Sequence, residues 1–422
     1  MAAKVNKILI PLTILLIPAY LIRFSVFGIP TNLLEILVLV VFISAFLSKQ
    51  KIDYKEFYKQ NKVYFFGILL VIAGLFISTV VSGHYRIGFG IIKGWFIIPL
   101  VFSWVLIKEI KKKEDLENIL KWLYLGIFGV AAISLIYYFQ GNVTYDSRLK
   151  ALYLSPNHLA MYLTPGIIIG IYLIQNTISQ LTGESYKEMR LLAYTGKSYH
   201  SLFFNTISFL IILSSLYLTY SYAAWVAVIL SLIITALFGK RKLSKKFVLI
   251  GAIIILLIIM SQWNTEKMEN LKNFSRSSLE SRVIIWQSAT KILKDNVIWG
   301  IGPGNFQNIY LEYQKYFPPY LEWAVPQPLN LYLAFWLQSG IFGFIGFLIL
   351  IIKWMHETLK NEKNSLFLIE AVLLGIMLYI LIHGFIDTPY WKNDLAVIFW
   401  IIFSLRIVAS QLKNPKLLAQ TS

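Results

Sequence analysis

Long apolar runs alternate with short polar connections along the whole chain. An α-helix needs about 20 apolar residues to cross a bilayer, and most runs are close to that length. The runs fall at residues 8–26, 32–48, 63–82, 87–107, 119–140, 158–175, 201–220, 222–238, 247–262, 331–352, 365–383 and 395–411. The pattern predicts an all-α, polytopic membrane protein of about 12 transmembrane helices. No small-residue cleavage site follows the first run, so we expect a span there and not a signal peptide.

One connection is much longer than the others and divides the chain. We expect residues 1–262 to form the first nine transmembrane helices, and residues 263–330 to form a large extracytoplasmic loop. Residues 331–422 then form the last three transmembrane helices and a cytoplasmic tail. About 26 of the 39 lysines and arginines lie in alternate connections and at the chain ends, and basic residues favour the cytoplasmic side. Both termini are therefore predicted to be cytoplasmic.

The long loop contains the signature of a helix start. Ser277 and Glu280 have the spacing of a capping box. Leu279, Val283, Trp286 and Leu293 recur at helical spacing, which predicts an amphipathic helix lying on the membrane surface. The glycine-rich run 300–306 must be a turn. Its backbone N–H groups either face an anion or simply end the helix.

Composition supports a membrane protein and excludes several other classes. Apolar residues make up 57% of the chain and charged residues 14%, and the mean hydropathy is +0.66. The absence of cysteine rules out a disulfide framework, an iron–sulfur cluster and a thiolate zinc site. The net charge of +18 is explained by topology and anionic lipid, so no nucleic-acid partner is expected. We find no phosphate-binding loop, dinucleotide turn or metalloprotease motif, and expect neither a cofactor nor a metal.

Five cations are predicted on the outer side. Arg86 and Lys93 are seven residues apart, and Lys93 lies inside an apolar run, where an ammonium group needs a partner. Arg148 and Lys150 lie in the first outer loop, and Arg282 lies on the predicted amphipathic helix. Taken singly, each of these cations could equally be an anchor that binds a lipid phosphate. Together they suggest binding of a diphosphate, because guanidinium groups match phosphate oxygens.

Four short segments beside the spans contain distinctive residues in a fixed order. They are Arg148 with Ser155-Pro156-Asn157-His158-Leu159-Ala160; Thr219-Tyr220-Ser221-Tyr222-Ala223-Ala224-Trp225; Ser281-Arg282-Val283-Ile284-Ile285-Trp286 with Gly300-Ile301-Gly302-Pro303-Gly304-Asn305-Phe306; and Leu329-Asn330 with Gly340-Ile341-Phe342-Gly343. In this order they resemble motifs of the O-antigen ligase and O-antigen polymerase family. The motif positions are Asn157, Trp286, Gly302, Gly304, Asn330, Gly340 and Gly343. The resemblance runs from about Arg148 to the C-terminus.

The resemblance implies a multi-pass protein of the bacterial cytoplasmic membrane that transfers a glycan. The donor would be a polyprenyl-diphosphate-linked oligosaccharide, the acceptor a hydroxyl group, and the reaction would use no nucleotide and no metal. Membrane lipid and glycan-assembly proteins would be its other partners. Arg282 and Arg148 occupy positions that match the family, as residues that bind the diphosphate. Two positions depart from it, because the family histidine is Leu329 and the arginine of the turn between two spans is Tyr222.

A substitute for the missing histidine is available near the end of the eleventh predicted span. His383 and Asp387 are four residues apart, so a continuing helix would let the carboxylate orient the imidazole as a base. A pair that only caps the helix is the alternative. His84 and His158 are further outer histidines beside motifs.

Other functions are compatible with the same residues. A transporter or flippase of lipid-linked glycan would also use anion-binding groups, and Lys93 inside a span favours it. A family member that binds lipid-linked glycan without catalysis is a second alternative. A structural scaffold for a glycan-assembly complex is the third alternative, and no sequence feature supports it.

Overall fold

Helices make up almost all of the regular structure in the described part of the chain. A computed structural model describes residues 2–48, 50, 52–182, 196–238, 253, 260–261, 263, 268–269, 278–319, 325–360 and 366–413. The earlier helical elements are α1 (Ala2–Leu15), the 3₁₀ turn η1 (Ile17–Leu21), α2 (Leu33–Phe46), α3 (Tyr54–Ser82), α4 (Tyr85–Ile91), the π-helical turn η2 (Ile92–Ile97), α5 (Ile98–Glu109), α6 (Lys113–Phe139) and α7 (Pro156–Thr182). The later ones are α8 (Gly196–Leu218), α9 (Tyr222–Phe238), α12 (Ser278–Asp295), α13 (Phe306–Tyr313), the 3₁₀ turn η4 (Gln314–Tyr316), α14 (Leu331–Leu359), α15 (Phe367–His383) and α16 (Asn393–Leu412).

Many of these helices are membrane spans by length and composition. Seven are long and apolar enough to cross a bilayer, namely Tyr54–Ser82, Tyr85–Glu109, Lys113–Phe139, Pro156–Leu181, Tyr199–Leu218, Leu331–Leu359 and Asn393–Leu412. Shorter apolar helices are Val5–Leu15, Leu33–Phe46, Tyr222–Leu237 and Phe367–His383. Each of them overlaps a predicted span, while the predicted span at 247–262 lies almost wholly outside the described residues. The chain is an all-α, multi-pass membrane protein.

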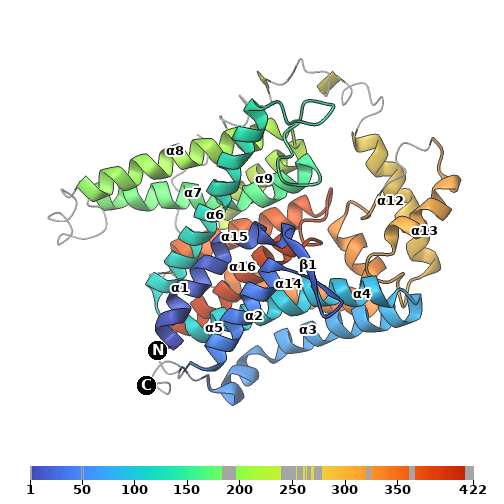
Figure 1. Ribbon diagram of the computed structural model, residues 1–422, viewed down its shortest axis with the longest axis horizontal. Helices are drawn as coiled ribbons and strands as arrows, with labels where there is room; N and C mark the ends of the chain where they lie inside the picture. Colours follow the sequence, from blue (N-terminus) through green and yellow to red (C-terminus); the bar gives the residue numbers. More distant parts are fainter. Residues whose placement is uncertain are drawn as a thin grey trace.

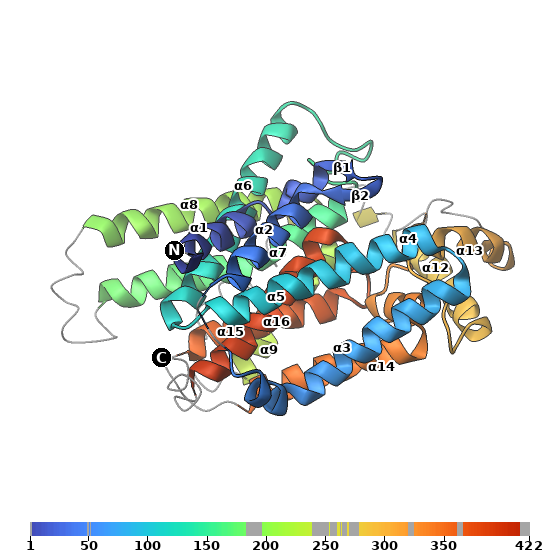
Figure 2. The ribbon, with the colours of Figure 1, turned by 60° about the horizontal axis from the view of Figure 1, so that its bottom comes forward.

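The two ends of the helix bundle carry different elements. In Figures 1 and 2, α12 and α13 lie at one end, and the start of α1 and the end of α16 lie toward the other. Figure 2 shows α3 beside α14 along its length. Gly74 of α3 permits this close approach, because a side chain there would overlap Ser339 and Gly343 of α14. At Gly340, which has φ of +64°, α14 is kinked.

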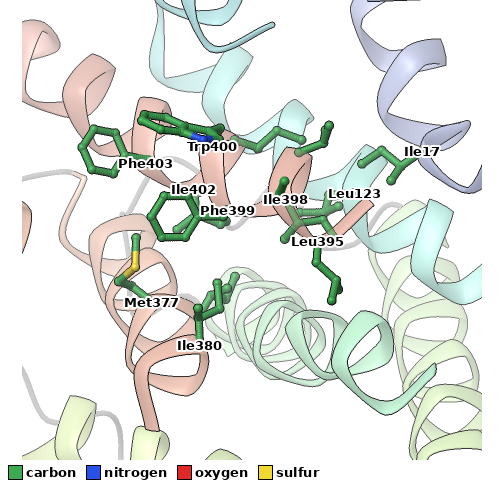
Figure 3. Close-up of a cluster of buried hydrophobic side chains, with 14 of the residues drawn as sticks. Ile17, Leu123, Met377, Ile380, Leu395, Ile398, Phe399, Trp400, Ile402 and Phe403 are labelled. Atoms are coloured by element: carbon green, nitrogen blue, oxygen red, sulfur yellow. The ribbon is translucent and has the colours of Figure 1, made fainter. Parts of the chain in front are cut away.

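The core is centred on α16. This helix is mostly apolar on every side, and every residue from Asp394 to Ala409 is buried, as expected for a helix enclosed by others. Figure 3 shows Phe399 of α16 toward Met377 and Ile380 of α15, while Trp400 lies beside Phe403 on the other side of the helix. Ile17 of η1 and Leu123 of α6 are further members of this cluster. The core thus joins elements from the beginning, middle and end of the chain.

The N-terminal run at 8–26 is not one continuous span. Helix α1 ends at Leu15, and the chain continues through η1 into a hairpin of β1 (Arg23–Val26) and β2 (Ile29–Asn32). Phe27 and Gly28 both have positive φ, which suits the two-residue turn of a hairpin. The turn was not predicted because the residues of this stretch are apolar, like those of a continuous span. The hairpin leads directly into α2.

Helix α12 is present but covers a small core of its own. Its buried residues Ile285, Ala289 and Ile292 pack with Phe306 of α13 and Leu337 of α14. Val283, which the sequence pattern places on the apolar face, is instead 42% exposed. The predicted N-cap, Ser277, lies outside the described residues. The helix therefore packs against protein on a neighbouring face, and Val283 of the predicted membrane face stays exposed.

Candidate functional site

Arg148 is held in the α6–α7 loop by contacts on several sides. Its Nε donates to the Thr219 carbonyl oxygen at 2.8 Å, and a terminal nitrogen donates to Asn157 Oδ1 at 2.8 Å. The other terminal nitrogen lies 3.8 Å from an Asp146 carboxylate oxygen. Asn157, a motif position, thus orients the side chain of Arg148. The guanidinium group has a fixed orientation before any ligand binds.

Arg148 and Arg282 lie close enough to influence each other electrostatically. Burial lowers the pKa of Arg148, Asp146 raises it, and the Arg282 cation lowers it further. Tyr222, at the position of the family arginine, also acts on Arg148. The structure therefore places Arg282 and Tyr222 within electrostatic range of Arg148, although the three are far apart in the sequence.

Arg282 is anchored to the connection between α15 and α16. It lies near the start of α12 and is only 7% exposed. Its Nε donates to the Ile386 carbonyl oxygen at 2.9 Å, and a terminal nitrogen lies 3.7 Å from Asp387 Oδ2. Asp387 Oδ1 accepts a hydrogen bond from the Thr388 amide at 2.8 Å. Helix α12 is thereby fastened to the α15–α16 connection at Arg282.

Lys392 is a further cation of this region that the sequence analysis did not single out. It is the N-cap residue of α16 and is partly buried. Burial lowers the pKa of Lys392, Asp394 and Asp387 raise it, and Arg23 of the hairpin lowers it. A lysine flanked by Asp387 and Asp394 just before an apolar run was the available signal. Lys392 thus lies at the start of α16, within electrostatic range of Asp394 and Asp387.

Lys93 has a partner of its own and does not join the two arginines. Its Nζ lies 2.7 Å from Glu35 Oε2 and donates to the Pro30 carbonyl oxygen at 2.5 Å. Glu35 is 5% exposed and also accepts a hydrogen bond from Thr31 at 2.7 Å. The expectation that Lys93 serves a shared anion site is therefore corrected. An ammonium group within a span needs a counter-charge, and α2 supplies it.

The two remaining predicted cations are exposed. Arg86 lies on α4, and Lys150 lies in the α6–α7 loop. Neither side chain has a hydrogen-bond or ion-pair partner among the described residues. The first outer-facing histidine, His84, is likewise exposed just before α4. These residues are accessible to solvent or lipid and are not built into the site.

The motif glycines shape the turn after α12, and their amides are already used. Gly302 and Gly304 have φ of +84° and +79°. The Gly302 amide donates to Ser78 Oγ at 2.9 Å, and the Gly304 amide donates to Gln338 Oε1 at 3.0 Å. The turn therefore docks α12 and α13 onto α3 and α14. Of the two interpretations, a structural turn fits these contacts, because the amides face protein and not an anion. Gly343 lies where α3 meets α14.

The segment that aligns with the family histidine packs onto the end of α15. Asn330 caps α14 by accepting from the amides of Tyr332 and Leu333, each at 3.0 Å. Its side-chain nitrogen donates to the Phe385 carbonyl oxygen at 3.1 Å. The carbonyl oxygen of Leu329 accepts from Trp286 Nε1 at 3.1 Å. Trp286 and Asn330 thus hold this segment between α12 and the turn that follows His383.

His383 and Asp387 do not form the expected pair. The Asp387 amide donates to the His383 carbonyl oxygen at 3.0 Å, so the chain does continue for one helical turn. The Asp387 carboxylate, however, faces Arg282. His383 Nδ1 is hydrogen-bonded to the Tyr379 hydroxyl at 2.6 Å. A tertiary ion pair has replaced the local contact that the spacing suggests.

His158 belongs to a different buried pair. Its Nε2 lies 3.1 Å from both carboxylate oxygens of Asp394, and the two side chains are 3% and 0% exposed. The ring of Tyr153 packs against the imidazole at 4.4 Å between centroids. This pair fastens the start of α7 to the start of α16. Across the described residues, no group of three or more His, Asp or Glu side chains could hold a metal ion.

Comparison with known proteins identifies the region around this site. A protein-family model described as O-antigen ligase matches residues 207–348. No curated protein matches the chain. The matched residues run from α8 to the middle of α14 and include Arg282, Trp286 and Asn330. The match confirms that this multi-pass membrane protein has an O-antigen ligase family region at residues 207–348.

Proposed function

We propose that the protein transfers a glycan from a polyprenyl-diphosphate carrier to a hydroxyl acceptor on the outer side of the cytoplasmic membrane. The family match supports O-antigen ligase-type glycan transfer. The observation that carries the finer proposal is that Arg148 and Arg282, which come from separate segments and are each held by hydrogen bonds to the protein, lie within electrostatic range of each other. Their guanidinium groups have the shape and charge to bind the two phosphates of such a donor.

The two arginines would act mainly on the leaving group. As the bond between the anomeric carbon and the diphosphate breaks, negative charge grows on the departing oxygen. Cations that are already oriented stabilise this charge without reorganising. Thr219 and Asn157 orient Arg148, and Ile386 orients Arg282. Polyprenyl diphosphate is a good leaving group, so the reaction needs no nucleotide.

The acceptor hydroxyl also needs a base, and we assign this role to His383. A base contributes about 10²–10⁴-fold to such a proton transfer. Leucine at position 329 cannot accept a proton, but His383 lies directly before the turn onto which residues 329–331 pack. The acceptor oxygen forms its bond to the anomeric carbon as its proton moves to His383 Nε2. The carrier leaves as a diphosphate bound by the arginines. Asp387 pairs with Arg282 in this mechanism, and its charge also acts on the His383 imidazole.

The sequence feature that favoured transport of the lipid-linked glycan, a lysine inside a span, is explained by an ion pair. A lysine inside a span favours a pathway for anions, but Glu35 at 2.7 Å neutralises Lys93. Arg86 and Lys150, which are exposed, would make secondary contacts with donor or lipid phosphates. Binding without catalysis remains as a distinct outcome of the assay below.

The decisive experiment measures release of the free carrier. Purified protein in proteoliposomes would be given a polyprenyl-diphosphate oligosaccharide and a glycan or lipid acceptor, and both the released carrier and the new linkage would be followed. Arg282→Ala should lower the rate about 10²–10³-fold, the usual effect of removing one group that stabilises a developing anion. Lys291→Ala on the exposed side of α12 is the matched control.

The outcomes separate the alternatives. Full activity of folded Arg282→Ala protein contradicts the assignment of Arg282. Wild-type protein that binds the donor but never releases its carrier supports a non-catalytic role. Movement of intact donor across the proteoliposome membrane, without release, supports transport. Circular dichroism and gel filtration establish that each variant is folded.

A further inference from the structure

The pair of His158 and Asp394 begins one residue away from the side chain that orients Arg148. Asn157 Oδ1 accepts a hydrogen bond from a terminal nitrogen of Arg148 at 2.8 Å, and His158 is the next residue of the chain. His158 Nε2 lies 3.1 Å from both carboxylate oxygens of Asp394, and the two side chains are 3% and 0% exposed. Adjacent residues of an α-helix point about 100° apart, so one turn of α7 contacts Arg148 on one side and α16 on another.

The local hydrogen bonds at the start of α7 do not fix its position in the bundle. Helix α7 begins at Pro156, which has no amide hydrogen to donate. The amides of His158 and Leu159 donate to the hydroxyl and the carbonyl oxygen of Ser155, each at 3.2 Å. These bonds join residues within one turn, whereas the contact of His158 with Asp394 joins residues 236 positions apart in the sequence. That contact therefore places the first turn of α7 against α16.

Asp394 is a firm anchor for this contact. It lies in the first turn of α16, where the helix dipole favours a carboxylate. The preceding residue, Asn393, accepts a hydrogen bond from Trp95 Nε1 at 3.0 Å. Every residue from Asp394 to Ala409 is buried, and a close-packed interior leaves such a helix little freedom to shift. A buried carboxylate needs a hydrogen-bonding partner, and His158 supplies one.

The start of α16 and the connection before it are linked to both arginines of the proposed site. Arg282 donates to the Ile386 carbonyl oxygen at 2.9 Å. Arg148 is linked to Asp394, further along the same stretch, through the first turn of α7. The relative position of the two guanidinium groups thus depends on residues 386–394.

We infer that His158 and Asp394 are positioning residues for Arg148, on which they act through Asn157. Their contact holds the first turn of α7 so that the Asn157 oxygen stays on the guanidinium group. When that contact is lost, Arg148 keeps its bond to the Thr219 carbonyl oxygen, so the guanidinium group is misdirected and not set free. The consequence for glycan transfer rests on the proposed function, whereas the link from His158 to Arg148 does not.

The link can be measured without an activity assay. Phenylglyoxal modifies guanidinium groups, and peptide mass spectrometry gives its rate of reaction with Arg148. His158→Ala and Asn157→Ala should each raise this rate about 2- to 10-fold, the effect of losing one hydrogen bond. The exposed Arg86 is the internal reference, and its rate should not change. Tyr124→Phe is the matched control, because it removes a buried hydrogen bond that joins α6 to α8 and should leave the Arg148 rate unchanged.

Two further variants separate positioning from loss of structure. His158→Gln keeps a side-chain N–H for Asp394 and should leave the Arg148 rate near that of the wild type. His158→Leu/Asp394→Leu replaces both partners by apolar groups, which can be nearly neutral for stability, yet it should raise the rate as His158→Ala does. An Arg148 rate that rises in Asn157→Ala but stays at the wild-type value in this folded double variant would overturn the inference.

Glycan transfer then tests the consequence. His158→Ala should lower kcat about 10-fold, since misplacement of a group in the site by about 1 Å costs up to about 10²-fold. In an Asn157→Ala background the same change should have little further effect, because its route to Arg148 is already broken. Losses of kcat that simply multiply would show that His158 acts through the fold and not through Asn157. If the Arg148 rates are as stated but the wild type releases no carrier, the proposed function fails while the link stands.

Discussion

Lys93 and Arg282 are both cations with a buried carboxylate beside them, yet the two pairs differ in geometry. Lys93 Nζ approaches Glu35 to 2.7 Å and Pro30 to 2.5 Å, within distances typical of strong hydrogen bonds. The Asp387 oxygen stands 3.7 Å from the Arg282 nitrogen. The first pair is a closed contact between an ammonium group and a carboxylate. The second is an ion pair too long for a hydrogen bond.

The surroundings of the two pairs differ as well. The Lys93 pair joins η2, α2 and the hairpin. Arg282 lies near Arg148 and belongs to the segment that matches the O-antigen ligase family. The lesson is that position within a predicted span does not decide which cation is functional. Its partners do.

Neutralising each pair as a whole tests this difference and has the largest expected effect. The double variant Arg282→Met/Asp387→Asn removes the diphosphate clamp and should lower glycan transfer at least about 10²-fold. The double variant Lys93→Met/Glu35→Gln removes an equal charge pair and should keep transfer within about threefold of the wild type, because that pair touches no substrate. Carrier release in proteoliposomes is the measurement. An equal loss of glycan transfer in both double variants would contradict the assignment of the Arg282 pair to the site and of the Lys93 pair to structure.

The helices and the arginines could be predicted from the sequence because local patterns determine them. Apolar runs of sufficient length specify membrane helices whatever their neighbours are. Arg148 and Arg282 could be selected because they stand within segments of recognisable motifs. Their proximity could not be derived, since it depends on how α12 docks against the α15–α16 connection.

The partners could not be predicted because they come from other helices. His383 and Asp387 have the right spacing to interact, but Arg282 of α12 takes the carboxylate. Tyr379 has the same spacing from His383 on the other side and forms the bond instead. Glu35 is unremarkable as a residue until α2 is packed against η2 near Lys93. Sequence periodicity shows which residues share a helix face, and tertiary packing selects among them.

Breaking the Lys93 pair on one side alone should affect stability more than activity. Lys93→Met leaves the buried Glu35 carboxylate without its cation, which is destabilising. Since Lys93 is about one-third exposed, we expect about 1–3 kcal/mol rather than the full effect of a deeply buried pair. Thermal unfolding in detergent measures the change. Adding Glu35→Gln should restore part of the stability, and a single variant as stable as the wild type would show that the pair is not structural.

The exposed cations should have the smallest effect. Arg86 and Lys150 have no protein partner among the described residues, so Ala at either position removes only a screened attraction for the donor phosphates. We expect the donor KM to rise about two- to threefold with kcat unchanged, and the rise to vanish at about 0.5 M salt, where exposed charges are screened. Lys59→Ala, an exposed lysine on α3, is the control. A fall in kcat for Arg86→Ala or Lys150→Ala, or an effect that persists at high salt, would place that cation within the site beside Arg148 and Arg282.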